Sequence, residues 1–203
     1  MARRNQRGFN LIEVMVTLTV LAVLITLGAP SFSDWLHTQR IRSAAEAVVN
    51  GLQIARGEAI KQNQPVVLGF EPGLGTGWTV CPATVQPCDS TTPAPPAPNS
   101  YIQQKGAQEG TANAFLTASA TPSPQPPVPA TLVTFSALGA ALPRNLDGSQ
   151  PVVQVDVYYN DPTTCSANGG TMRCMRVVVT AGGNVRMCDP TPGVVAPDPR
   201  ACP

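Results

Sequence analysis

The sequence predicts an α+β protein in which one long N-terminal helix precedes a head rich in β-strands. Residues 9–62 first form a continuous apolar stretch and then place apolar residues at spacings of three and four, which is a helical pattern. Beyond residue 63 the apolar residues fall in short β-branched runs bounded by Gly, Pro and Asn, which is typical of strands. We expect the sheet to pack on the apolar stripe of the helix.

The composition limits the classes of protein to which the chain can belong. It has 203 residues, including 22 prolines, with 12% charged residues and a net charge of +1. An average soluble domain carries about 25% charged residues. The low net charge argues against a strongly electrostatic nucleic-acid binder. The 43% hydrophobic content argues against a disordered protein, which combines low hydrophobicity with high net charge.

The N-terminus carries three arginines, Arg3, Arg4 and Arg7, ahead of a long apolar segment. As a helix, residues 9–29 would extend about 32 Å, which matches the roughly 30 Å hydrocarbon core of a bilayer. The last sixteen of them, residues 14–29, carry no charge. We predict a transmembrane helix at 9–29, with the basic end in the cytoplasm by the positive-inside rule and the rest of the chain outside.

Two simpler interpretations compete with this one. A cleaved secretory signal has an apolar core of about 7 to 15 residues, whereas this stretch is longer, contains Glu13 and continues into a helical pattern beyond Pro30. A plain membrane anchor leaves Glu13 unexplained, because a carboxylate inside a spanning segment costs a few kcal/mol and requires a partner.

The segment Gly8-Phe9-Asn10-Leu11-Ile12-Glu13 resembles the type IV prepilin motif of type IV pilins and type II secretion pseudopilins. The resemblance implies that prepilin peptidase removes residues 1–8 by cutting between Gly8 and Phe9, and that the new amino group of Phe9 is methylated. It also implies that Glu13 pairs with the N-terminal ammonium of a neighbouring subunit, a partner of the kind that a carboxylate in lipid requires. Loss of the leader removes three of the 13 basic residues and none of the 12 acidic ones, so the mature chain has a net charge of −2.

The helical pattern continues as an amphipathic segment at residues 30–62. We expect Pro30 to bend or loosen the helix where it leaves the bilayer, and the helix to end at residues 63–65. One apolar stripe should face the head, and its members are Ile41, Ala45, Val48, Leu52, Ala55 and Ala59.

The predicted head, residues 63–203, contains five strands and two proline-rich loops. We expect the strands at residues 66–70, 78–81, 131–136, 152–159 and 174–181. In the fourth, Val155 and Val157 should point away from Gln154 and Asp156, as in a half-buried strand. The segments at 90–100 and 121–129 are too rich in proline for a sheet interior, so we expect exposed loops there.

The six cysteines all lie outside the cytoplasm in this topology, where disulfides persist. A zinc site is the alternative, but the paired Cys-x-x-Cys spacing is missing and the chain has one histidine. Fifteen disulfide connectivities are compatible with six cysteines, and sequence neighbours form one of them. The candidates are Cys81, Cys88, Cys165, Cys174, Cys188 and Cys202.

A wider resemblance rests on the prepilin start, the helix end QIARGEAIKQNQPVVL, the β-rich head and the tail GGNVRMCDP. Together these resemble the GspH/FimT group of minor pilins and pseudopilins, which includes FimU-like proteins. The group implies a type IV pilin-like fold, with the long helix packed on antiparallel sheets, and a subunit that initiates or caps a filament in type IV pilus biogenesis or type II protein secretion. The sequence leaves open which of the two machines applies.

The same resemblance implies partners and a location. The partners would be prepilin peptidase, an inner-membrane assembly platform and other minor pilins or pseudopilins. The chain would be a single-pass protein of the bacterial inner membrane with a cytoplasmic N-terminus and a periplasmic head, and would then enter the filament tip.

DNA binding is an alternative function, because some FimT-like members bind DNA in natural transformation through arginines near the end of the head. Arg186 matches the second arginine of the GRxR-type motif, but Asn184 stands where the first would be. The nearby Asp189 and Asp198 weaken any basic patch, so we expect these arginines to be solvated or ion-paired instead. The candidate contacts are Arg173, Arg176, Arg186 and Arg200.

A membrane-anchored periplasmic enzyme is the remaining alternative. Nucleophilic catalysis needs a base near Ser, Thr or Cys, and the single histidine, His37, lies on the helix just beyond the apolar segment. No spacing singles out a pair of catalytic carboxylates. We therefore expect no enzymatic activity, no cofactor and no bound metal.

Overall fold

The structure is a computed structural model that describes residues 10–203 except 72, 74, 97–98 and 124. The chain divides into two compact units, Met1–His37 and Thr38–Pro203. Helix α1, Leu11–Gln62, contributes to both units, and each is described here by itself.

In the first unit, α1 exposes nearly all of the apolar side chains that the structure describes, including Leu11 at 76% and Leu24 at 62%. In the part of the chain whose side chains are described, no helix has an apolar stretch long enough to cross a membrane. The predicted transmembrane segment 9–29 begins outside the described residues, at Phe9, and remains a prediction, as does the bend at Pro30.

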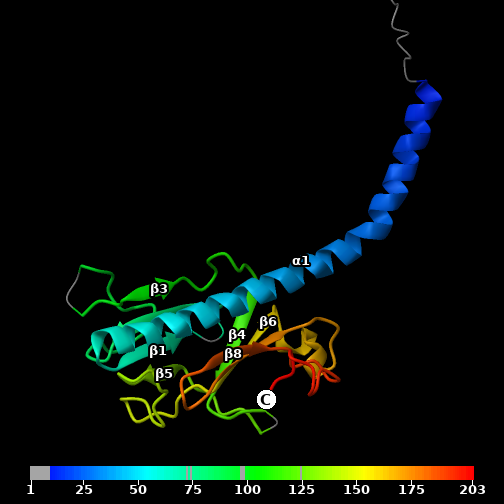
Figure 1. The fold of residues 1–203 in the computed structure, drawn as a ribbon. Coiled ribbons are helices and arrows are strands. Elements are labelled where there is room, and N and C mark those ends of the chain that lie inside the picture. The colour runs from blue at the N-terminus through cyan, green and yellow to red at the C-terminus, as the bar shows by residue number, and fades with distance from the viewer. Residues whose placement is uncertain (1–9, 72, 74, 97–98, 124) are drawn as a thin grey trace, which may run out of the picture. The chain divides into compact units, whose positions relative to one another are not determined.

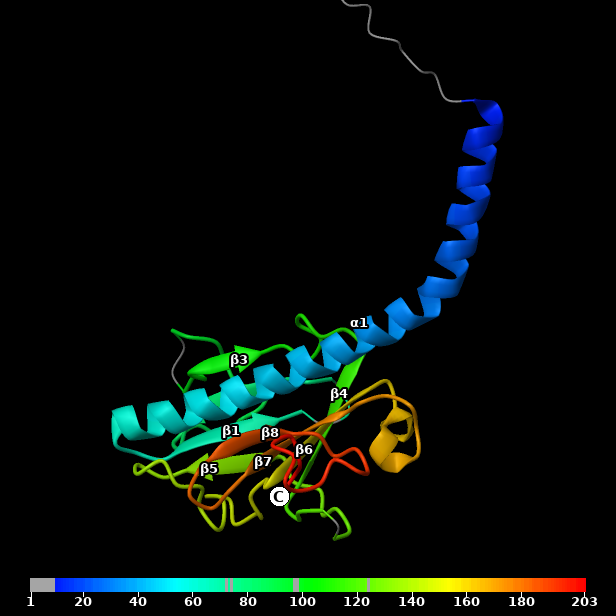
Figure 2. The ribbon, with the colours of Figure 1, turned by 45° about the vertical axis from the view of Figure 1, so that its right-hand side comes forward.

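In the second unit, the remainder of α1 lies against the head (Figures 1 and 2). All six residues of the predicted apolar stripe, from Ile41 to Ala59, are fully buried, which confirms the helical spacing argument. The helix ends at Gln62 as expected, because Asn63 adopts a left-handed backbone with φ of 52°.

The head contains two four-stranded antiparallel sheets, so the α+β prediction is confirmed. One sheet has the order β3-β2-β1-β5, formed by Gln103–Lys105, Trp78–Pro82, Val66–Phe70 and Leu132–Phe135. The other has the order β4-β6-β7-β8, formed by Ala114–Ser119, Gln154–Tyr159, Met175–Val179 and Val185–Cys188. One core joins the helix and both sheets, since Val48, Leu68 and Val155 all belong to the same buried cluster.

The five predicted strands correspond to β1, β2, β5, β6 and β7. Three further strands, β3, β4 and β8, were not predicted. Gln103–Lys105 is short and polar, and Val185–Cys188 has only four residues. Neither is long enough for an alternation of apolar and polar residues to distinguish a strand from a loop. Each is recognised as a strand only by its hydrogen bonds to the neighbouring strand.

The two proline-rich segments are mostly exposed in their described parts, as predicted. The segment at 121–129 also covers the outer side of the second sheet. Its Ser123 backbone N–H donates to Gln154 Oε1 at 2.9 Å, and Ser119 forms a bridge with Pro129. Gln154 is consequently buried, at 6% exposure.

Candidate assembly segment and head surface

Glu13 lies in the first turn of α1, with its side chain in solvent. The Asn10 carbonyl accepts from the backbone N–H groups of Glu13 and Val14 at 3.0 and 3.2 Å, which starts the helix. A carboxylate in the first turn is favourable beside the positive end of the helix dipole. The predicted cleavage residues Gly8 and Phe9 lie outside the described residues, so their roles remain predictions.

Most of the exposed side chains near Glu13 on α1 are apolar. Such a large exposed apolar surface marks a site that contacts protein or membrane. Its large hydrophobic residues are Leu11, Ile12, Val14, Met15, Val16, Leu18, Val20, Leu21, Val23, Leu24 and Ile25.

The hydroxyl groups within this stretch are bonded inside the helix. Thr17, Thr19 and Thr26 donate to the carbonyls of Val14, Val16 and Val23 at 3.0, 2.8 and 2.9 Å. A hydroxyl taken out of water without a partner costs free energy, so these bonds adapt the segment to a dry environment.

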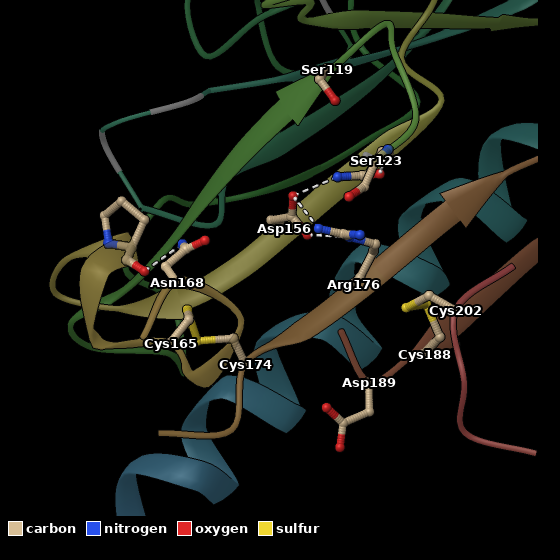
Figure 3. A network of polar contacts seen from close by, with 12 residues as sticks. Ser119, Ser123, Asp156, Cys165, Asn168, Cys174, Arg176, Cys188, Asp189 and Cys202 are labelled. Atoms are coloured by element: carbon tan, nitrogen blue, oxygen red, sulfur yellow. Dashed lines mark hydrogen bonds and ion pairs between the residues drawn. A yellow bond between two sulfur atoms is a disulfide. The ribbon is translucent and has the colours of Figure 1, made fainter. Parts of the chain in front are cut away.

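The outer face of the second sheet carries a network of polar contacts (Figure 3). Arg176 on β7 donates through Nε and Nη2 to the two carboxylate oxygens of Asp156 on β6, at 2.6 and 3.3 Å. Gln154 Nε2 donates to the same carboxylate at 2.7 Å. The side chains of Arg176 and Asp156 are only 15% and 32% exposed, so the pair is structural.

A cavity of about 500 Å³ lies over this network, and its lining includes Asp156, Arg176 and Tyr158. Burial, and next the charge of Asp161, raise the pKa of the Tyr158 hydroxyl. Because Asp156 is bonded to both Arg176 and Gln154, it is not arranged as a general base.

The four candidate DNA-contacting arginines do not form one free basic patch. Arg176 is ion-paired as described, which confirms the expected alternative role for this residue. Arg186 Nη2 donates to the carbonyls of Pro199 and Ala201 at 2.7 and 3.1 Å. Arg200 pairs with Asp198 at 2.8 Å, and Arg173 is exposed. Three of the four therefore have bonding partners within the head.

The Asp198 carboxylate is strongly stabilised by its neighbour. Its pKa falls to about 2, chiefly because the Arg200 side chain and then the Arg200 backbone N–H donate to it. The same contact raises the pKa of Arg200. The two residues lie in the C-terminal tail, where they shape a turn that ends near Ala201.

Three kinds of contact hold the C-terminal tail, residues 189–203, against β8: a disulfide, a backbone hydrogen bond and side-chain hydrogen bonds. Cys188 and Cys202 form a disulfide. The Asp189 backbone N–H donates to the Arg200 carbonyl at 2.8 Å, and Arg186 bonds two tail carbonyls. The sequence motif indicated Arg186 only as a candidate DNA contact. Its hydrogen bonds to the tail carbonyls could not be predicted, because they depend on where the tail lies in the folded head.

All six candidate cysteines form disulfides between sequence neighbours: Cys81–Cys88, Cys165–Cys174 and Cys188–Cys202. This resolves the connectivity that the sequence left open. Among the described residues, no cluster of three or more His, Cys, Asp or Glu side chains could hold a metal ion. His37 Nε2 lies 3.1 Å from the Ser33 hydroxyl, one turn earlier on α1.

Comparison with known protein families decides the assignment. The family described as Type II transport protein GspH matches residues 44–183, and the Prokaryotic N-terminal methylation motif matches residues 3–29. The chain belongs to the GspH family. As a GspH-family member carrying the methylation motif, it is a GspH/FimT-like minor pilin or pseudopilin.

Two solved structures similar to this GspH-family chain are minor filament subunits. The type IV minor pilin FimU of Pseudomonas aeruginosa is 16% identical with a TM-score of 0.46, over 73% of this chain and 88% of FimU. The minor pseudopilin EpsH of the Vibrio cholerae Type 2 Secretion System is 14% identical with a TM-score of 0.44, over 74% of this chain and 98% of EpsH. No curated protein sequence matches the chain significantly.

Proposed function

We propose that this GspH-family subunit acts at the initiation or tip of a type IV filament, in type IV pilus biogenesis or type II protein secretion. Prepilin peptidase removes residues 1–8, Phe9 is methylated, and residues 9–29 hold the subunit in the bacterial inner membrane with the head in the periplasm. An inner-membrane assembly platform then adds it to other minor subunits. The observation that carries the proposal is the exposed apolar helix surface with Glu13 in its first turn.

Assembly follows from the chemistry of that surface. Apolar helices of neighbouring subunits bury one another's side chains, and Glu13 selects their register by pairing with the methylated Phe9 ammonium of a neighbour. A charge pair surrounded by apolar side chains specifies position, because any other register leaves the carboxylate unpaired. The acid thus confers specificity on an otherwise non-directional contact.

Replacing Glu13 by Ala tests this role. We expect the Glu13→Ala chain to be processed and retained in the membrane fraction, but lost from sheared filaments or from a cross-linked tip complex. The matched control is Glu46→Ala, which removes another exposed helical acid, one that pairs with Arg42 at 2.9 Å. Normal incorporation of the Glu13 variant would refute the charge-pairing mechanism.

Mass spectrometry of the purified chain tests the processing step. We expect a mature N-terminus at a methylated Phe9. An intact Met1 terminus in cells that contain the peptidase would contradict the assignment of residues 1–8 as a leader.

A further inference from the structure

Two aromatic side chains on α1 are exposed just beyond the apolar segment. Phe32 and Trp35 are 60% and 55% exposed, and their rings stack with centroids 5.8 Å apart and planes 27° apart. Residues three apart lie on the same face of a helix. Each such side chain has roughly 150–250 Å² of surface that favours burial, so the pair forms one apolar patch.

The position of the patch along the helix matches the thickness of a bilayer. Leu11 and Phe32 are 21 residues apart, which corresponds to about 32 Å of helix and to the roughly 30 Å hydrocarbon core. Polar contacts begin at the pair and continue beyond it: Ser33, between the two aromatic residues, contacts His37, and Arg42 pairs with Glu46 in solvent. The aromatic pair therefore lies where an apolar segment gives way to a water-exposed one.

The chemistry of the pair fits the headgroup layer better than water or the hydrocarbon core. A tryptophan ring buries an apolar body and keeps an N–H for hydrogen bonding, and Trp is enriched at membrane–water interfaces for that reason. A contact surface for a partner protein would be expected to exclude water around the aromatic residues, whereas Phe32 and Trp35 lie beside the polar contact between Ser33 and His37.

We propose that Phe32 and Trp35 form an aromatic anchor that binds the periplasmic headgroup layer of the inner membrane before the subunit is assembled. The inference rests on the membrane stage of the proposed function and adds a residue-level role to it. Glu13 lies about 33 Å of helix away from Trp35. Fixing the aromatic pair in one headgroup layer therefore holds Glu13 close to the opposite one, where a carboxylate costs less than at the bilayer centre.

The two tryptophans of the chain make the anchor measurable. Trp35 is exposed, whereas Trp78 is buried in the head at 2% exposure. The mature chain, from residue 9 onward, is reconstituted into phosphatidylethanolamine–phosphatidylglycerol vesicles doped with phosphatidylcholine brominated either near the headgroup or near the bilayer centre. We expect Trp emission to be quenched more strongly by the shallow bromine, and Trp35→Phe to abolish most of the quenching while leaving Trp78 emission intact.

The outcomes separate this inference from the proposed function. If the chain floats with the vesicles but shallow bromine does not quench Trp35, or deep bromine quenches it more, the anchor is overturned and the membrane stage stands. If the chain fails to float with the vesicles, the membrane stage is itself overturned, and the anchor with it. Shallow quenching that persists in Trp35→Phe would assign the signal to Trp78 and also overturn the anchor.

Discussion

Two glycines of α1 provide a sharp test of how the helix packs on the head. Gly51 is buried, and a Cβ placed there would lie 2.7 and 2.8 Å from the Cε2 and Cδ2 atoms of the Trp78 ring. Gly57 is exposed, and a Cβ there would have no atom within 4 Å outside the neighbouring helix backbone. Replacing either glycine by alanine changes the helix propensity by the same amount, so the two variants differ only in whether the new methyl group meets the Trp78 ring.

The magnitudes follow from these distances. Alanine is about 0.8–1.0 kcal/mol more favourable than glycine inside a helix, so Gly57→Ala should stabilise the head by about that amount. At Gly51 the new methyl would lie well inside the 3.5–4.0 Å separation that carbon atoms prefer. Trp78 is 2% exposed and has little room to move, and overpacking of this kind costs about 1–3 kcal/mol. The two variants should therefore differ by about 1–3 kcal/mol.

Thermal unfolding of the head, from residue 31 onward with its disulfides intact, measures the difference by circular dichroism. For a domain of this size, 1 kcal/mol shifts Tm by about 2–4 °C. We expect Gly57→Ala to raise Tm and Gly51→Ala to melt roughly 2–12 °C below it. Equal Tm values for the two variants would refute the close approach of α1 to the Trp78 ring.

Three further predictions concern the core, the tail and its charges. Leu52→Ala should lower the free energy of unfolding by about 2–5 kcal/mol in a urea titration, because Leu52 is fully buried; a loss below about 1 kcal/mol would contradict its place in the core. Replacing Cys188 and Cys202 together by Ser should cost about 3 kcal/mol, as expected for a short closed loop, and an unchanged urea midpoint would contradict this. Asp198 should titrate near pH 2 by NMR, with its pKa restored towards the ordinary value of about 3.9 in Arg200→Ala. Since the pKa of Asp198 is lower in the folded chain than in the unfolded one, the ionised carboxylate should stabilise the fold fully above about pH 4, and this stabilisation should be lost as the pH falls towards 2. A titration of Asp198 unaffected by Arg200→Ala would contradict the pairing.

Local patterns predicted the helix and most of the strands correctly. The stripe from Ile41 to Ala59 could be identified because a helix repeats its buried positions within a few residues. β6 could be identified because its residues alternate in character within one strand. By contrast, β3 and β8 have three and four residues, and the neighbouring strand supplies the hydrogen bonds that define them.

On the head surface, too, the sequence named the residues but not their partners. Three pairs of neighbouring cysteines could be named as candidates, but only the folded chain selected their connectivity from the fifteen that six cysteines allow. The arginines could be named as charged residues near the C-terminus, but their partners could not. Asp156 is 20 residues from Arg176, and the carbonyls that Arg186 bonds are 13 and 15 residues from it.

The sequence by itself determined the N-terminal motif, the apolar segment that follows it and the amphipathic helix, because each depends on the order and spacing of residues along one continuous segment. The methylation motif match, at residues 3–29, rests on the first two of these features, whereas the GspH match, at residues 44–183, covers the end of the helix and most of the head. Only the tertiary structure decided the order of the strands, the attachment of the tail to β8 and the close contact between Gly51 and Trp78. Those features depend on which distant segments meet in space, and pairing across a sheet or against a helix leaves no periodic signal in the chain.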